Sequence, residues 1–169
     1  MSENKPETFW RIDCSPIAVK LLPGKFEHVK TVLLVDDDLG FAFWLGQALD
    51  RAGYETWPAH SVPAAESLLA TVRLPVDLLV INASLPRAPA FAADLGRTRA
   101  GLKVIAVYEG PDDVGQPFPE ACAAHHKPKT IDTLAKLEWV QLVTGVLAVN
   151  GGGAVNCEFS QTGKFRRRL

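Results

Sequence analysis

Three consecutive carboxylates give the sequence its clearest chemical signal. The apolar run Val32-Leu33-Leu34-Val35 leads directly into Asp36-Asp37-Asp38. A short continuous apolar run is typical of a strand buried on both faces of a parallel sheet. The carboxylates then lie at the carboxyl end of that strand, where open α/β sheets bind their ligands. Because adjacent carboxylates repel one another, this arrangement favours a bound cation.

Two further apolar runs also end in polar side chains. Residues 78–81 lead into Asn82, and residues 104–107 lead into Tyr108. In a doubly wound sheet with strand order 2-1-3-4-5, the first and third strands are neighbours. We therefore expect the acidic run to lie beside Asn82, with Tyr108 one strand further along the same edge.

Helical spacing and capping residues separate these strands. Apolar residues recur at steps of three and four from Phe41 to Ala52, which predicts a helix with Asp38 as N-cap and Gly53 as C-cap. The other predicted elements are a strand over 54–59, a helix from the Ser61 cap through 72, a helix over 90–98, a weak strand over 121–126 and a last helix from the Thr130 cap to about 150. One side of that last helix carries Ile131, Leu134, Leu137, Val140, Gln141 and Thr144.

The alternation of strands and helices indicates an α/β fold with right-handed crossovers and a doubly wound, five-stranded parallel sheet of order 2-1-3-4-5. We expect an N-terminal extension over 1–30, the domain itself over 31–150 and a flexible C-terminal tail over 151–169, which begins with three glycines. The extension either packs on the domain through Phe9, Trp10 and Phe26 or is a partly ordered tail.

Composition narrows the class of protein. The chain has 169 residues, 47% hydrophobic and 22% charged, which fits one domain with a full core. A net charge of −1 gives no general reason to expect nucleic acid or an anionic membrane as a partner. There is no secretory signal and no apolar stretch long enough to span a bilayer, and the three cysteines do not form a disulfide pattern. We therefore expect a cytoplasmic protein.

Two other clusters have simpler explanations than a functional site. Cys122, His125 and His126 suggest a metal site, but adjacent histidines on a strand point to opposite faces and cannot chelate together. The basic cluster Lys164, Arg166, Arg167 and Arg168 can contact phosphates or an acidic partner, although a solvated tail is the simpler interpretation.

Residues 31–149 resemble a receiver domain of the two-component response-regulator family. The features that carry the resemblance are the apolar strand ending in Asp36-Asp37, the Ala52-Gly53-Tyr54 turn, the Asp77 strand that ends at 82, and the pairs Leu85-Pro86 and Lys127-Pro128. The resemblance implies a flavodoxin-like fold. It also implies that Asp36 and Asp37 match the pair that holds Mg²⁺ in the family and that Lys127 matches the lysine that neutralises the phosphoryl group.

Three of the family's five hallmark positions differ in this sequence. Asn82 stands where the family has the phospho-acceptor Asp, Tyr108 stands at the Ser/Thr position, and Ala124 stands at the aromatic switch position. An amide is neutral and a poor nucleophile, so phosphorylation at Asn82 is not expected. The missing carboxylate also weakens any Mg²⁺ site, and the alternative is that Lys127 holds the acidic pair without metal. The segment between Tyr108 and Lys127 is about one helical turn shorter than is usual in the family, and it contains three prolines.

We interpret the chain as a stand-alone, degenerate receiver (a pseudo-receiver) that takes part in two-component-type signalling by binding a protein partner, without phosphorylation. The partner would be a signalling protein or a histidine kinase-like protein, homodimerisation is plausible through the extensions, and no enzymatic turnover, membrane or nucleic-acid binding is expected. The first alternative is a conventional phosphorelay regulator that uses a displaced acidic residue. The second is an adaptor that binds nucleic acid or an acidic partner through the basic tail.

Overall fold

The structure is a computed structural model in which residues 28–110 and 118–149 are described. A five-stranded parallel sheet has the order β2-β1-β3-β4-β5, as predicted. The strands are β1 (Thr31–Val35), β2 (Glu55–Ala59), β3 (Val76–Asn82), β4 (Lys103–Tyr108) and β5 (Ala123–His126). The helices are α1 (Leu39–Arg51), α2 (Val62–Thr71), α3 (Ala88–Thr98) and α4 (Thr133–Ala148). Of the predicted extensions, residues 1–27 and 151–169 lie outside the described residues.

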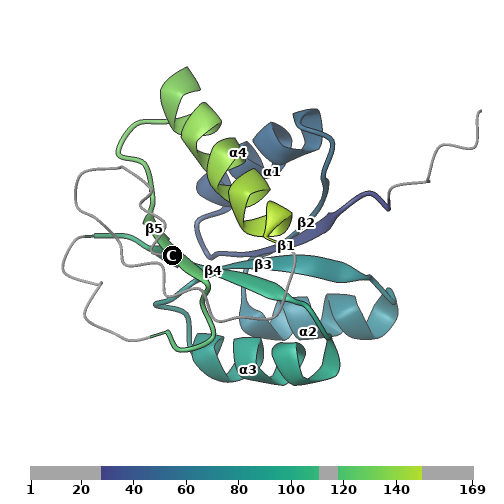
Figure 1. The fold of residues 1–169 in the computed structure, drawn as a ribbon. Helices are drawn as coiled ribbons and strands as arrows, with labels where there is room; N and C mark the ends of the chain where they lie inside the picture. The colour runs from purple at the N-terminus through teal and green to yellow at the C-terminus, as the bar shows by residue number, and fades with distance from the viewer. Residues whose placement is uncertain (1–27, 111–117, 150–169) are drawn as a thin grey trace, which may run out of the picture.

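The helices cover both faces of the sheet, with α1 and α4 on one face and α2 and α3 on the other (Figure 1). Alternate residues of β1 enter the two layers of the core: Val32 and Leu34 pack with α1 and α4, and Leu33 and Val35 pack with α2 and α3. Every residue of β1 is buried. This double burial explains why the strand is apolar from Val32 to Val35 and why charged residues appear only after Val35.

The N-caps of the first two helices are those that the sequence predicts, whereas the C-cap of α1 is Ala52 rather than the predicted Gly53. Asp38 caps α1 by accepting a hydrogen bond from the Phe41 N–H at 3.0 Å, and Ser61 caps α2 by accepting one from the Ala64 N–H at 3.3 Å. Gly53 follows α1 with a φ of 92°, the left-handed conformation that terminates a helix at low cost for glycine. The acidic run is thus the junction between a buried strand and a capped helix.

The predicted N-cap of the last helix, Thr130, is wrong. The N-cap of α4 is Asp132, whose carboxylate accepts a hydrogen bond from the Ala135 N–H at 2.8 Å. Thr130 lies before the helix, and its hydroxyl donates to Asp132 at 3.5 Å instead. Both residues favour N-cap positions, so residue type alone did not distinguish between them, and in the structure it is Asp132 that caps the first turn.

The side of α4 that carries the residues named in the sequence analysis, among them Leu134 and Leu137, faces away from the sheet. Leu134 and Leu137 are 76% and 54% exposed, whereas the side that packs on the sheet carries Trp139, Val143 and Val146. Apolar residues occur on both sides of α4, so their spacing alone did not distinguish the buried side. Trp139 packs its ring edge against Phe41, with 5.3 Å between ring centroids, and this contact fixes α4 against α1.

Candidate functional site

The predicted site residues that follow or end β1, β3 and β4 lie at one edge of the sheet. Parallel pairing aligns Val35 with Ile81 and Asn82 with Val107, so the residues that end β1, β3 and β4 are adjacent. Asp36 and Asn82 are buried, with 3% and 1% of their surfaces exposed. The crossovers leave the carboxyl ends of these strands open to solvent, which makes this edge the candidate site.

Lys127 forms the ion pair at the centre of the site. The backbone N–H of Lys127 donates to the Tyr108 carbonyl at 2.8 Å, which fixes the residue beside the end of β4. Its ammonium group lies 2.7 Å from Asp36 Oδ1 and 5.4 Å from the centroid of the Phe41 ring. The same Asp36 oxygen accepts the Asp38 N–H at 2.8 Å. Lys127 therefore holds the first carboxylate of the acidic run.

The pKa values of Asp36 and Lys127 are both raised, but burial and charge act in opposite directions on each of them. Burial raises the pKa of Asp36 above its usual value, and the contacts with Lys127 and with the Asp38 N–H offset this rise only in part. Burial alone would lower the pKa of Lys127, but its contacts with Asp36 and Glu109 outweigh burial and raise it. The lysine is therefore fully charged at neutral pH, whereas the buried carboxylate is held in an unfavourable environment.

Asn82 is held in one orientation by its neighbours. Its side-chain oxygen accepts the Ser84 N–H at 2.9 Å, which leaves the NH₂ group to face the acidic run. That NH₂ group donates to Asp37 Oδ1 at 3.0 Å. The residue at the acceptor position therefore presents hydrogen-bond donors toward the second carboxylate.

Glu109 is a member of this site that the sequence analysis missed. Its Oε1 accepts from the Lys127 ammonium at 3.0 Å and from the Asn82 NH₂ group at 3.4 Å. Glu109 directly follows Tyr108, the last residue of β4, and that position was the available signal. A charged residue one position after a strand end lies at the same edge as the strand-end residue itself.

Two of the switch-equivalent positions lie apart from the charged cluster. Tyr108 is 4% exposed, with its ring centroid 6.1 Å from that of His126 on β5, and burial raises its pKa. Ala124 is exposed on β5, where it pairs with Ala106 of β4. Tyr108 thus fills space in the core, and Ala124 provides no aromatic ring.

The arrangement does not suit Mg²⁺ as it stands. Asp36 Oδ2 is buried and has no hydrogen-bond partner in the structure, which is the one feature that suits a cation. Asp37 Oδ1, however, already accepts an N–H of Asn82, and the Lys127 ammonium occupies the space between Asp36 and Glu109. Among the residues that the structure describes, no group of three or more His, Cys, Asp or Glu side chains is placed to hold a metal ion.

The candidate cysteine and histidine cluster is separated by the sheet. His125 packs on Trp139 of α4, with 4.8 Å between ring centroids, and lies 3.5 Å from Glu138, whereas His126 packs on Tyr108. The Cys122 thiol donates to the Val104 carbonyl at 3.1 Å. These contacts describe packed side chains rather than a shared ligand set.

No helix among the described residues is long and apolar enough to cross a membrane.

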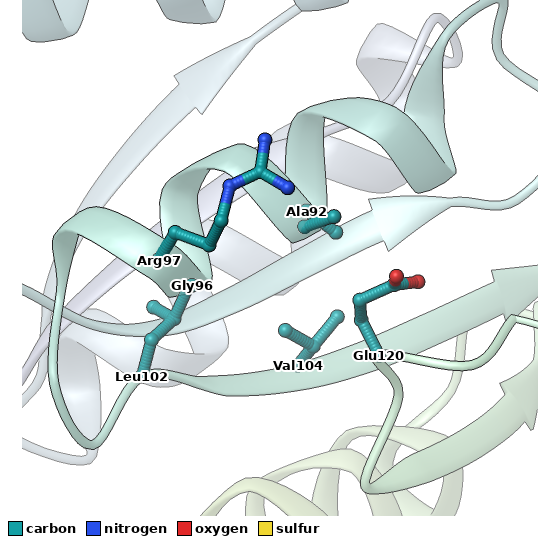
Figure 2. A pocket seen from close by; sticks show the side chains of 7 residues that line it. Ala92, Gly96, Arg97, Leu102, Val104 and Glu120 are labelled. Atoms are coloured by element: carbon teal, nitrogen blue, oxygen red, sulfur yellow. The ribbon is translucent and has the colours of Figure 1, made fainter.

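A shallow hollow of about 390 Å³ lies away from the charged edge, between α3 and the start of β4 (Figure 2). Small residues on α3, Ala92, Ala93 and Gly96, leave this space over Leu102 and Val104. Glu120 forms one wall, and one of its carboxylate oxygens is buried without a hydrogen-bond partner. A Cβ atom built on Gly96 would meet nothing within 4 Å, so the hollow reflects the missing side chain there.

Comparisons with known proteins identify the fold. No family model matches the sequence, and no curated protein matches it either. Solved structures do match, with a probability of 1.00. One is a signal receiver domain of an HD domain-containing protein from Pseudomonas fluorescens Pf-5, with a TM-score of 0.58 and 22% identity over 71% of this chain and 95% of that chain.

Two further structures show the same similarity. The Thermotoga maritima response regulator TrrA, solved in complex with Mg²⁺-BeF, has a TM-score of 0.55 and 19% identity over 70% of this chain and 99% of that chain. An orphan response regulator of H. pylori, HP1043, has a TM-score of 0.55 and 17% identity over 70% of this chain and 96% of that chain. The chain has the fold of response-regulator receiver (CheY-like) domains, which confirms the predicted fold class.

Proposed function

We propose that this chain is a pseudo-receiver: a receiver-fold signalling domain that works by binding a protein partner and is not phosphorylated at residue 82. The observation that carries the proposal is the state of Asn82. An aspartate at a strand end attacks phosphorus through a carboxylate oxygen. The Asn82 side chain has no charge, its oxygen accepts the Ser84 N–H, and its NH₂ group faces Asp37.

The surroundings of Asn82 support the same proposal. Lys127, which would neutralise an incoming phosphoryl group, is already paired with Asp36 and Glu109. Each charge at the centre of the site therefore has a partner within the chain. We further propose that the domain has no enzymatic turnover, because the charged cluster contains neither a nucleophile with an adjacent base nor a loop that cradles phosphate.

Any Mg²⁺ bound at Asp36 and Asp37 would be held weakly. The only carboxylate oxygens suited to a hard cation are those that Lys127 and Asn82 leave unused, such as Asp36 Oδ2. A cation must also compete with an ammonium group that is only 11% exposed. The TrrA complex shows that a protein of the same fold can hold Mg²⁺-BeF.

Exposed apolar side chains support a protein as the partner. Leu39 and Phe43 on α1 are 62% and 66% exposed, and Leu134 and Leu137 lie on the outer side of α4. A protein partner that covers these side chains would remove their apolar surface from water, which favours binding. We propose a cytoplasmic signalling protein or histidine kinase-like protein as the partner, and a second copy of this chain as the alternative.

Incubation with acetyl phosphate and Mg²⁺, followed by intact mass spectrometry, tests the proposal. We expect no phosphoryl group on this chain under conditions in which a conventional receiver domain is labelled in parallel. Labelling that peptide mapping assigns to Asp36, Asp37 or Asp38 would overturn the proposal and favour phosphorelay through a displaced acidic residue. Salt-dependent nucleic-acid binding that is lost on deletion from Lys164 onward would favour the basic-tail adaptor instead.

A further inference from the structure

Two donors that face the open edge of the sheet converge on one carboxylate. The Lys127 ammonium and the Asn82 NH₂ group lie 3.0 and 3.4 Å from the same oxygen, Glu109 Oε1. Their other contacts are with the acidic run, where Lys127 donates to Asp36 and Asn82 donates to Asp37. Glu109 therefore joins the two contacts from the solvent side.

The exposure of the three charged groups shows the direction from which Glu109 approaches. The side chains of Asp36, Lys127 and Glu109 are 4%, 11% and 54% exposed. Asp36 is thus the inner partner of the lysine, and Glu109 is the outer partner. An anion attached to residue 82 would have to contact Lys127 from this same outer side.

We propose that Glu109 is an internal anion that occupies the place at Lys127 and residue 82 where a phosphoryl group would otherwise lie. This inference rests on the proposed function and deepens it, because it names the group that closes the site in place of phosphorylation. The contact is autoinhibitory toward phospho-chemistry: a second anion must displace the Glu109 carboxylate from Lys127. Replacing Asn82 by aspartate is therefore not sufficient to restore a working acceptor site.

The first test follows the side-chain NH₂ signals of Asn82 by ¹H–¹⁵N NMR in the full chain. Glu109→Ala removes the contact without disturbing the core, because Glu109 is exposed. Glu138→Ala is the matched control, since Glu138 is also exposed and lies on α4. We expect the Asn82 signals to shift in Glu109→Ala and to stay unchanged in Glu138→Ala. Unchanged Asn82 signals in both variants would overturn the inference.

The second test measures Mg²⁺-dependent beryllofluoride binding in variants that carry an aspartate at 82. We expect Asn82→Asp to bind the probe at least tenfold more weakly than the double variant Asn82→Asp/Glu109→Ala, because a carboxylate beside Lys127 repels a second anion. Asn82→Asp/Asp38→Asn controls for charge alone, since Asp38 lies 4.0 Å from Lys127 and asparagine is also a good N-cap. Equal binding by Asn82→Asp and the Glu109→Ala double variant, or an equal gain in the Asp38→Asn control, would overturn the inference.

The two proposals can fail separately. Phosphorylation of the unmodified chain would contradict the pseudo-receiver proposal. Full beryllofluoride binding by Asn82→Asp alone would contradict only the role of Glu109. If Asn82→Asp does not fold, the NMR comparison of Glu109→Ala with Glu138→Ala still decides the question, because both variants keep Asn82.

Discussion

Replacing Lys127 by methionine should destabilise the fold by about 3 kcal/mol at neutral pH. Methionine keeps the length of the side chain and removes its charge, which leaves Asp36 buried with the Asp38 N–H as its remaining hydrogen-bond donor. Removing one partner of a buried ion pair costs roughly 3–5 kcal/mol. We expect the lower end of that range, because Glu109 is half exposed and regains water when Lys127 is lost.

The loss should depend on pH in a defined direction. The pKa of Asp36 is already raised by burial, and removal of Lys127 raises it further. A carboxyl group with a raised pKa in the folded state costs stability once it ionises, so the cost disappears as the pH falls through that pKa. The pKa of Lys127 is also raised. The stabilising effect of Lys127 is therefore fully present below the pKa of lysine in the unfolded chain, about 10.4, and is lost only at higher pH. The difference between the variant and the parent chain should therefore shrink as the pH falls through the raised pKa of Asp36 toward the value of an unfolded aspartate, about 3.9.

Urea unfolding followed by Trp fluorescence checks this prediction, because Trp139 is buried in the core that α4 covers. The double variant Asp36→Asn/Lys127→Met should recover most of the loss, since it leaves no buried charge. Lys129→Met is the control, because Lys129 is exposed and its replacement should change the free energy of unfolding by no more than about 0.5 kcal/mol. The reasoning would be refuted if Lys127→Met lost the same unfolding free energy at neutral and at acidic pH and if that loss persisted in the double variant with Asp36→Asn.

Three further predictions test the backbone and the packing of α3 and α4 by the same urea assay. Gly96→Ala should stabilise the fold by about 0.5–1 kcal/mol, because the new methyl group has free space in an exposed helix position; destabilisation would mean that the hollow is closed in solution. Arg87 has a φ of 67° and makes an ion pair with Glu66 at the surface, so Arg87→Gly should be about 1 kcal/mol more stable than Arg87→Ala; equal stabilities would contradict the left-handed backbone. Val143→Ala should cost about 2 kcal/mol and Leu134→Ala less than about 0.5 kcal/mol, because of these two residues only Val143 is buried. The reverse order of the two losses would place the other side of α4 on the sheet.

The sequence predicted the edge of the sheet well because each strand there is buried on both faces. Continuous apolar runs that end in Asp36, Asn82 and Tyr108 leave few other arrangements once the crossovers are right-handed. The alternation predicts a doubly wound parallel sheet, the resemblance to receiver domains implies its strand order, and the structure confirms that order. The helix caps Asp38 and Ser61 were found for a similar reason, since their hydrogen bonds are local in the sequence.

The features that were missed depend on contacts between distant residues. Glu109 takes its role from Lys127, which is 18 positions away and directly follows β5, the next strand of the sheet. The buried side of α4 depends on the contact between Trp139 and Phe41 on α1, and the apolar spacing of α4 alone gives no preference between its two sides. Asn82 was recognised as a departure from an acceptor site, but the orientation of its amide depends on Ser84 and Asp37 together.

The most direct test of the central claim is a titration of the unmodified chain with Mg²⁺ and then with beryllofluoride. Trp fluorescence reports on the site because Phe41, which lies under Lys127, contacts both Trp44 and Trp139. If Asn82, Lys127 and Glu109 close the site as described, neither addition gives a saturable change while circular dichroism shows a folded chain. A saturable, Mg²⁺-dependent response to beryllofluoride would contradict the account and show that the chain retains a working acceptor site.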